Sequence, residues 1–137
     1  MKTIFLDTNI IIDFLADRKP FSEDAARLFD LSLRGKCKIY MSALSYNNIY
    51  YILRKQFSHK ESVKMLSSIH EWTEMLDTTK QMVVASLQSE FSDFEDSIQY
   101  HTAISNRNIE CIVTRNTKDY KKSTLPVMTP GEVLSRY

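Results

Sequence analysis

Glycine and proline are scarce in this 137-residue chain, which contains two glycines and three prolines. With so few of these residues no interdomain linker is visible, and we expect a single domain over residues 1–137. A glycine-rich phosphate loop is also missing, which argues against P-loop and Rossmann nucleotide-binding folds. The sequence has no Gly-x-Ser-x-Gly motif, so it lacks the nucleophile turn of the α/β hydrolases.

Cysteine, histidine and net charge are limited as well. Cys37 and Cys111 lie in apolar, strand-like runs and their spacing gives no zinc motif, so we expect a reduced pair. The three histidines show no metal-binding spacing, and the formal net charge of +1 excludes a broadly basic surface while leaving room for a local basic patch. Neither a signal peptide nor a long apolar run is present, so we expect a cytoplasmic protein without membrane association.

Short apolar runs alternate with longer segments of helical periodicity. The apolar runs predict strands at Thr3–Leu6, Lys38–Met41, Thr73–Leu76, Ile109–Val113 and Val127–Met128. Helices are predicted near residues 9–17, 22–34, 44–57, 59–70, 79–90, 94–106 and 130–136. This alternation predicts an α/β fold, in which helices enclose a twisted parallel sheet of about five strands as a single α/β/α sandwich.

Acid and amide side chains occur where the predicted strands end or where the predicted helices begin. The residues concerned are Asp7, Asn47, Asn48, Asp96, Asn116 and Asp119. In a parallel α/β sheet, a helix that follows a strand begins at the carboxyl edge, and a helix that precedes a strand begins at the same edge. Since ligands bind beyond this edge, the connectivity predicts one polar site.

Several of these acids also have a purely structural interpretation. Asp7 is a favoured N-cap type and could serve only to begin the helix that follows it. Ser92 and Glu95 fit a capping box, which would give Glu95 a structural role. Asp119 lies in a segment that suits a turn. Capping and turn formation leave Asp96 unexplained.

Clustered carboxylates need a counter-charge, because like charges at close range raise each other's pKa. A hard divalent cation such as Mg²⁺ meets this need, since it binds oxygen ligands and keeps several waters, so two or three carboxylates are sufficient. Such a site can activate water and stabilise the transition state of phosphodiester hydrolysis.

Five segments of the chain, in the same order, resemble the PIN domain family. They are FLDTNIIID (5–13), MSALSYNNIYYILR (41–54), DFEDSIQ (93–99), VTRNTKDY (113–120) and LPVMTP (125–130). The ordered set spans nearly the whole chain and looks most like the bacterial branch related to VapC-type toxins. The resemblance implies a PIN-like fold and a Mg²⁺- or Mn²⁺-dependent RNA endonuclease. It also implies a homodimer that acts as the toxin of a toxin–antitoxin pair, with an antitoxin protein as partner.

The resemblance also implies roles for individual residues. Catalytic metal ligands would be Asp7, Asp96 and Asp119. Supporting roles would fall to Thr8, Asn9, Asn48, Asp93, Thr114 and Asn116, and RNA phosphates would meet Arg115 and Lys118. Asn48 occupies the place of the family's second acid, and Asn116 one of two places for the fourth. An amide can ligate a hard cation, but it supplies no charge and cannot act as a base.

Three hypotheses follow. The first is a metal-dependent ribonuclease whose site is weakened by Asn48. The second is a catalytically weak or inactive PIN module that binds RNA or a protein partner. The third is a phosphoacceptor domain that uses Asp77, which the single acid after the first strand disfavours.

Overall fold

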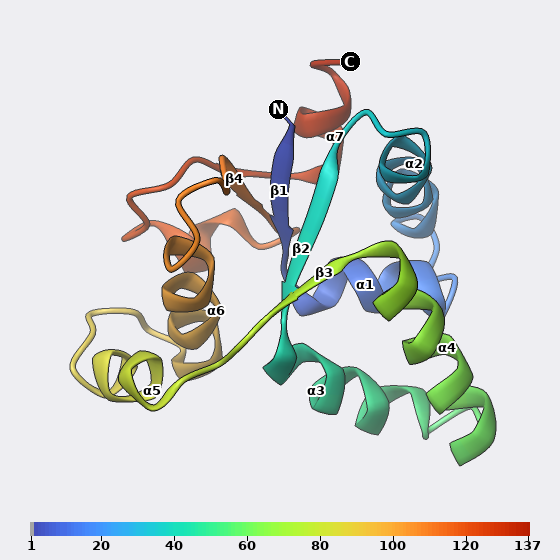
Figure 1. Cartoon of the computed structure of the whole chain (residues 1–137), viewed down its shortest axis with the longest axis horizontal. Coiled ribbons are helices and arrows are strands. Elements are labelled where there is room, and N and C mark those ends of the chain that lie inside the picture. Colours follow the sequence, from blue (N-terminus) through green and yellow to red (C-terminus); the bar gives the residue numbers. More distant parts are fainter. Residues whose placement is uncertain (1) are drawn as a thin grey trace.

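Strands and helices alternate along the chain in the computed structural model, which describes residues 2–137 (Figure 1). The strands are β1 (Thr3–Leu6), β2 (Lys38–Ser42), β3 (Glu74–Leu76), β4 (Cys111–Val113) and β5 (Val127–Met128). The helices are α1 (Thr8–Leu15), α2 (Ser22–Leu33), α3 (Ala43–Leu53), α4 (His59–Trp72), α5 (Lys80–Leu87), α6 (Phe94–Ile104), the 3₁₀ helix η1 (Thr117–Tyr120) and α7 (Pro130–Leu134). Each predicted element is present; β1 and β5 have the predicted bounds, and the other elements differ from theirs by a few residues at one or both ends.

The sheet is parallel throughout and its strand order is β3-β2-β1-β4-β5. β1 lies at the centre, where Phe5 pairs with Tyr40 of β2 on one side and with Ile112 of β4 on the other. From β1 the chain adds β2 and β3 on one side and β4 and β5 on the other. The strand order therefore reverses beside β1, and in open α/β sheets the crevice at such a reversal is where ligands bind.

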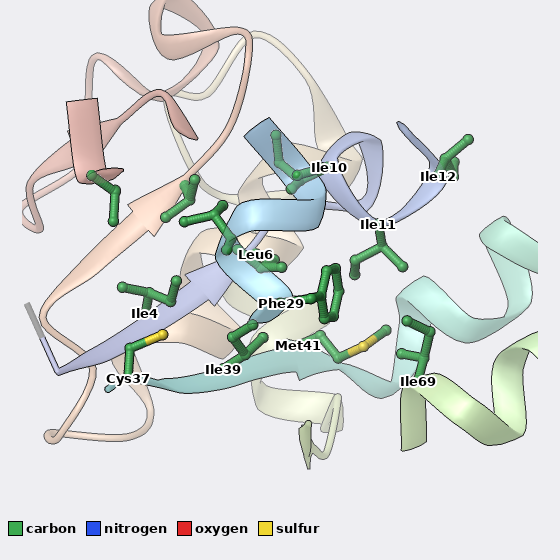
Figure 2. Close-up of a cluster of buried hydrophobic side chains, with 14 of the residues drawn as sticks. Ile4, Leu6, Ile10, Ile11, Ile12, Phe29, Cys37, Ile39, Met41 and Ile69 are labelled. Atoms are coloured by element: carbon green, nitrogen blue, oxygen red, sulfur yellow. The ribbon is translucent and has the colours of Figure 1, made fainter. Parts of the chain in front are cut away.

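Alternating side chains of the strands form a core on each face of the sheet. Ile4 and Leu6 belong to the larger cluster, which packs against α1, α2, α3, α4 and α7. Figure 2 shows this cluster, in which Phe29 of α2 lies over the strands. Phe5 points to the opposite face and packs with α6 and Tyr120 of η1. Burial on both faces explains why the strands read as nearly continuous apolar runs.

Both cysteine thiols are buried and free, in agreement with the expected lack of a disulfide. Burial raises the pKa of the Cys111 thiol to about 11, so this group is inert as a nucleophile at neutral pH. Between residues 2 and 137, no helix is both long enough and apolar enough to cross a membrane.

Candidate active site

Asp7 joins the centre of the sheet to the first helix. Its backbone N–H continues the β1–β4 ladder by donating to the carbonyl of Val113 at 2.9 Å, and its extended backbone makes it the N-cap of α1. One carboxylate oxygen accepts from the Thr8 amide at 2.8 Å, and the other accepts from the Thr114 hydroxyl at 2.9 Å. The predicted role of Asp7 as a helix N-cap is therefore confirmed. Capping occupies only one of the two oxygens, so it does not account for the second.

The Asp7 carboxyl is nearly enclosed, with 5% of the residue exposed. Burial raises its pKa from 3.8 to about 6, and the hydrogen bonds from Thr114 and Thr8 oppose this rise only in part. A proton or a cation bound here would therefore stabilise the folded protein.

Asp96 faces the same space from the beginning of α6. Burial, together with the negative charges of Asp7, Asp93, Asp119 and Glu95, raises its pKa to about 7. Carboxylates that perturb each other in this way are close in space, as the connectivity of the sheet predicts.

The N-terminus of α6 differs from the sequence prediction. Asp93, rather than Ser92, is the N-cap, and its carboxylate accepts from the Asp96 amide at 2.9 Å. Ser and Asp are about equally good caps, and here the extended backbone of Asp93 decides the choice. The predicted capping box is therefore wrong. Glu95 is free of that role, and its carboxylate instead accepts from the Thr8 hydroxyl at 3.4 Å.

The segment after β4 completes the rim. Thr114 is buried behind Asp7, and its hydroxyl also accepts a hydrogen bond from the backbone N–H of Asn116 at 3.2 Å. Asn116 then leads into η1, where the Asp119 amide donates to the Asn116 carbonyl at 3.0 Å. Asn116 is exposed and Asp119 half-buried, so both side chains can meet a ligand.

These elements enclose an open cavity of about 320 Å³, the carboxylate cavity. Its lining contains the acids and polar side chains Asp7, Thr8, Asn9, Asp93, Glu95, Asp96, Asn116 and Asp119. The remaining lining is Ile12, Arg18 and Ile52. Seven of the residues predicted to form the site thus meet in one cavity, and Glu95 joins them.

Asn48 is not among the residues that line this cavity. It is half-buried on α3, one helical turn before Ile52, which does reach the lining. Asn47 is exposed. The supporting role of Asn48 remains a prediction that rests on its position in the family's motif.

A buried polar network, which the sequence analysis did not identify, lies behind the carboxylates. The Gln99 amide of α6 donates to the Thr8 hydroxyl at 2.9 Å and to the Ser45 hydroxyl at 2.8 Å. The Thr8 and Ser45 hydroxyls also contact each other at 2.8 Å. Gln99 thereby connects α6, which carries Asp96, to α1, which follows Asp7. Its position three residues after Asp96, on the same helix face, was the available signal.

Tyr120 is the second residue that the sequence analysis missed. Its hydroxyl donates to Asp96 at 3.5 Å, although the residue is only 1% exposed. Burial raises the pKa of this hydroxyl far above its usual range, and the charges of Asp7 and Asp96 add to the effect. Tyr120 therefore remains a neutral hydrogen-bond donor beside the two carboxylates.

The donor chemistry of the cavity fits a hard divalent cation, since its polar groups, apart from the Arg18 guanidinium, are carboxylate, amide and hydroxyl oxygens. Asn9 is one of the lining residues, and its buried Oδ1 has no hydrogen-bond partner. Within residues 2–137, however, no three His, Cys, Asp or Glu side chains form a ready-made metal cluster. The carboxylates of Asp7, Asp96 and Asp119 are thus not close enough together to bind one metal ion directly all at once. The arrangement fits Mg²⁺ or Mn²⁺ held by few protein ligands and several waters.

The two predicted RNA-binding cations lie just outside the cavity. Lys118 is exposed and lines a neighbouring hollow together with Asn116 and Asp119. Arg115 is instead held by Asp13, through contacts of 2.7 Å from Nε and 3.2 Å from Nη2, and its guanidinium stacks 4.0 Å from the ring centre of Phe21. Asp77 follows the edge strand β3 and lies outside the carboxylate cavity, so the site is not built around it.

Comparison with known families agrees with this geometry. A family model described as PIN domain matches residues 3–118, which include every acid of the cavity except Asp119. The chain belongs to the PIN domain family. No curated protein matches it by sequence.

Solved structures of PIN proteins share the fold. A DNA-bound VapBC from Salmonella typhimurium superposes with a TM-score of 0.70 at 18% identity, covering 95% of this chain and 99% of that one. A toxin–antitoxin complex from Klebsiella pneumoniae gives 0.67 at 23% identity, with coverages of 93% and 97%. A VapC toxin from Mycobacterium tuberculosis, described as cleaving the sarcin–ricin loop, gives 0.62 at 13% identity, with coverages of 80% and 86%. Matches at these identities establish the parallel PIN-like fold.

Proposed function

We propose that this PIN domain is a divalent-metal-dependent RNA endonuclease, with Asp7 and Asp96 as its principal metal ligands. The observation that carries the proposal is the pair of carboxyls in one cavity, whose pKa values are raised to about 6 and about 7. Perturbation of this kind is characteristic of functional sites, because a stable fold gains nothing from uncompensated charges in a cleft. Mg²⁺ or Mn²⁺, when bound, would supply positive charge and an activated water for attack on the phosphodiester.

The protein's own contribution is to position charge. The Thr8 amide and the Thr114 hydroxyl fix both oxygens of Asp7, so this carboxylate meets a cation without reorganising. Tyr120 restrains Asp96 by a hydrogen bond. Asp119, Glu95 and Asp93 add negative charge around the cavity, and they can hold water molecules of the metal's hydration shell.

The RNA backbone would approach over Asn116 and the exposed Lys118. A single lysine binds phosphate as a point charge without reading sequence, so Lys118 would strengthen binding of any RNA. Arg115 is the weaker candidate for this task, since Asp13 already occupies two of its donors.

Toxin activity controlled by an antitoxin is the biological role that best fits this site, and a homodimer is the assembly we propose. The structural relatives support the role, because the Salmonella and Klebsiella structures are described as a VapBC and a toxin–antitoxin complex. An antitoxin would act by covering the carboxylate cavity. Both partners would work in the cytoplasm, where RNA is available.

Cleavage of structured RNA in the presence of Mg²⁺ or Mn²⁺ tests the enzymatic proposal. Wild type is compared with Asp7→Asn and Asp96→Asn, and with Asp77→Asn as a matched control that neutralises an exposed acid outside the cavity. We expect cleavage by wild type and the control, and loss of at least 100-fold in each cavity variant. Unchanged cleavage by Asp7→Asn would rule the proposal out.

A PIN module that binds RNA or protein without cleaving is the second candidate. It is favoured by the amide at position 48 and by the lack of a closed three-acid cluster in the described residues. Asn48→Glu separates the two candidates. Activity that appears only in this variant would show that the natural protein is a binding module.

A further inference from the structure

A second cavity, here called the Phe21 cavity, lies beside the carboxylate cavity and shares Asn116 with it. It measures about 460 Å³, which is within the size range of small-molecule sites. Its lining includes Asp13, Phe21, Asp24, Arg115, Asn116 and Gly131. Because Asn116 lines both cavities, one extended ligand can occupy the two together.

A rigid flat surface forms part of the Phe21 cavity. The Arg115 guanidinium stacks on the Phe21 ring at 4.0 Å, and the guanidinium donates two hydrogen bonds to the Asp13 carboxylate. Asp13 is 1% exposed, so its side chain is fixed by packing and holds the Arg115 guanidinium in one position. The stack is therefore held in place before any ligand arrives. Arginine planes and aromatic rings of this kind are what single-stranded RNA bases stack on.

The charge of the Phe21 cavity argues against phosphate as its ligand. Asp13 neutralises Arg115, which is the only cation of the lining. Asp24 adds a carboxylate whose nearest cation, Arg27, is 3.5 Å away. A neutral planar group with hydrogen-bond donors suits this surface better than an anion does.

Gly131 keeps the Asp24 carboxylate accessible. A Cβ placed on this glycine would lie 3.6 Å from Oδ2 of Asp24, so any larger side chain would project into the space in front of that oxygen. The opening in front of Asp24 thus depends on a residue without a side chain.

We propose that the Phe21 cavity binds a nucleobase of the RNA strand whose phosphate lies in the carboxylate cavity. This inference rests on the proposed ribonuclease function. The base stacks on the Arg115–Phe21 pair and donates an exocyclic amino group to Asp24. Adenine, guanine and cytosine carry such a group and uracil does not, so the cavity selects against uridine.

Nucleosides test the inference without involving the metal site, because they carry no phosphate. The four ribonucleosides are titrated into the wild-type protein while NMR signals of the Phe21 ring and the Gly131 amide are followed. We expect shifts with adenosine, guanosine and cytidine, and at least fivefold weaker binding of uridine. Absence of shifts with every nucleoside, or equal binding of uridine and cytidine, overturns the proposal.

Variants of the cavity provide the controls. Gly131→Leu fills the space and Asp24→Asn removes the charged acceptor, so each should weaken cytidine binding at least fivefold. Asp30→Asn is the matched control, since Asp30 is an exposed acid of the same helix that pairs with Arg34. If Gly131→Leu does not fold, Asp24→Asn still decides the matter. An arginine-rich peptide that shifts these signals when nucleosides do not would identify a protein-binding site and overturn the proposal.

Cleavage patterns separate failure of this inference from failure of the proposed function. If wild type cleaves RNA but Phe21→Ala leaves the base preference unchanged and nucleosides do not bind, the base site is refuted and the ribonuclease stands. If nucleosides bind as expected and no RNA is cleaved, the base site stands and the enzymatic proposal fails.

Discussion

Replacing Asp7 by asparagine is expected to stabilise the metal-free protein at pH 8. Asp7 is 5% exposed, and burial raises its pKa from 3.8 to about 6. This is a rise of about two units, each worth about 1.4 kcal/mol, so the ionised carboxylate costs the folded protein about 3 kcal/mol above pH 6. Asparagine has the same shape, carries no charge, and keeps an oxygen that can accept from the Thr8 amide.

The sign of the pH dependence follows from proton binding. Between about pH 4 and pH 6 the folded wild type holds a proton on Asp7 that the unfolded chain has lost, so the free energy of unfolding falls as the pH rises. Below pH 4 both states are protonated and the penalty vanishes. Asp7→Asn lacks this dependence, so its advantage over wild type should shrink by about 2 kcal/mol between pH 8 and pH 4.

Part of the gain is lost at Thr114. Its hydroxyl donates to Asp7 in the wild type and would have to accept from the asparagine amide instead, at a cost of about 1 kcal/mol. Urea unfolding in EDTA at the two pH values measures the result, and we expect Asp7→Asn to be about 2 kcal/mol more stable than wild type at pH 8. Asp77→Asn, at an exposed acid, serves as the control. A variant less stable than wild type at pH 8, or a difference independent of pH, would refute the electrostatic account of the site.

Three further predictions concern neighbouring groups. Arg115→Ala should lower the free energy of unfolding, measured in urea, by about 2 to 3 kcal/mol, because the buried Asp13 carboxylate loses its main ion-pair partner. A loss below about 0.5 kcal/mol would show that Arg18, which lies 3.9 Å from Asp13, is enough to compensate the Asp13 charge. Asn48→Glu should tighten Mn²⁺ binding in a calorimetric titration if α3 contributes to the site as the family's motif implies, and unchanged affinity would place Asn48 outside it. Mn²⁺ affinity of the wild type should fall as the pH drops from 8 to 6, because Asp7 and Asp96, with pKa values of about 6 and 7, must lose protons to bind; a flat profile would exclude both as ligands.

The convergence of the acids could be predicted because it depends on topology alone. In a parallel α/β sheet every helix begins at the edge where every strand ends, so the positions of Asp7, Asp96 and Asp119 in the chain place them together whatever the details of packing. The sheet itself follows from apolar runs that are buried on both faces, as Phe5 and its neighbours are.

Other features depend on register and on contacts between distant residues, which a single sequence does not reveal. Ser92 and Asp93 are adjacent and about equally good caps, so the N-cap of α6 was misassigned by one residue. Arg115 reads as a free cation because its partner, Asp13, is 102 residues away in the chain. Gln99 reads as an ordinary helix residue, since its partners on α1 and α3 come near only in the folded protein.

The origin of the oxygen in cleaved RNA tests the central claim most directly. Wild-type protein is incubated with RNA and Mn²⁺ in ¹⁸O-labelled water, and the product ends are weighed by mass spectrometry, with EDTA and Asp96→Asn as parallel samples. Attack by water at the carboxylate cavity predicts one ¹⁸O atom in the terminal phosphate, no cyclic phosphate, and no cleavage in either parallel sample. A 2′,3′-cyclic phosphate product, or cleavage that persists in EDTA, would contradict the account.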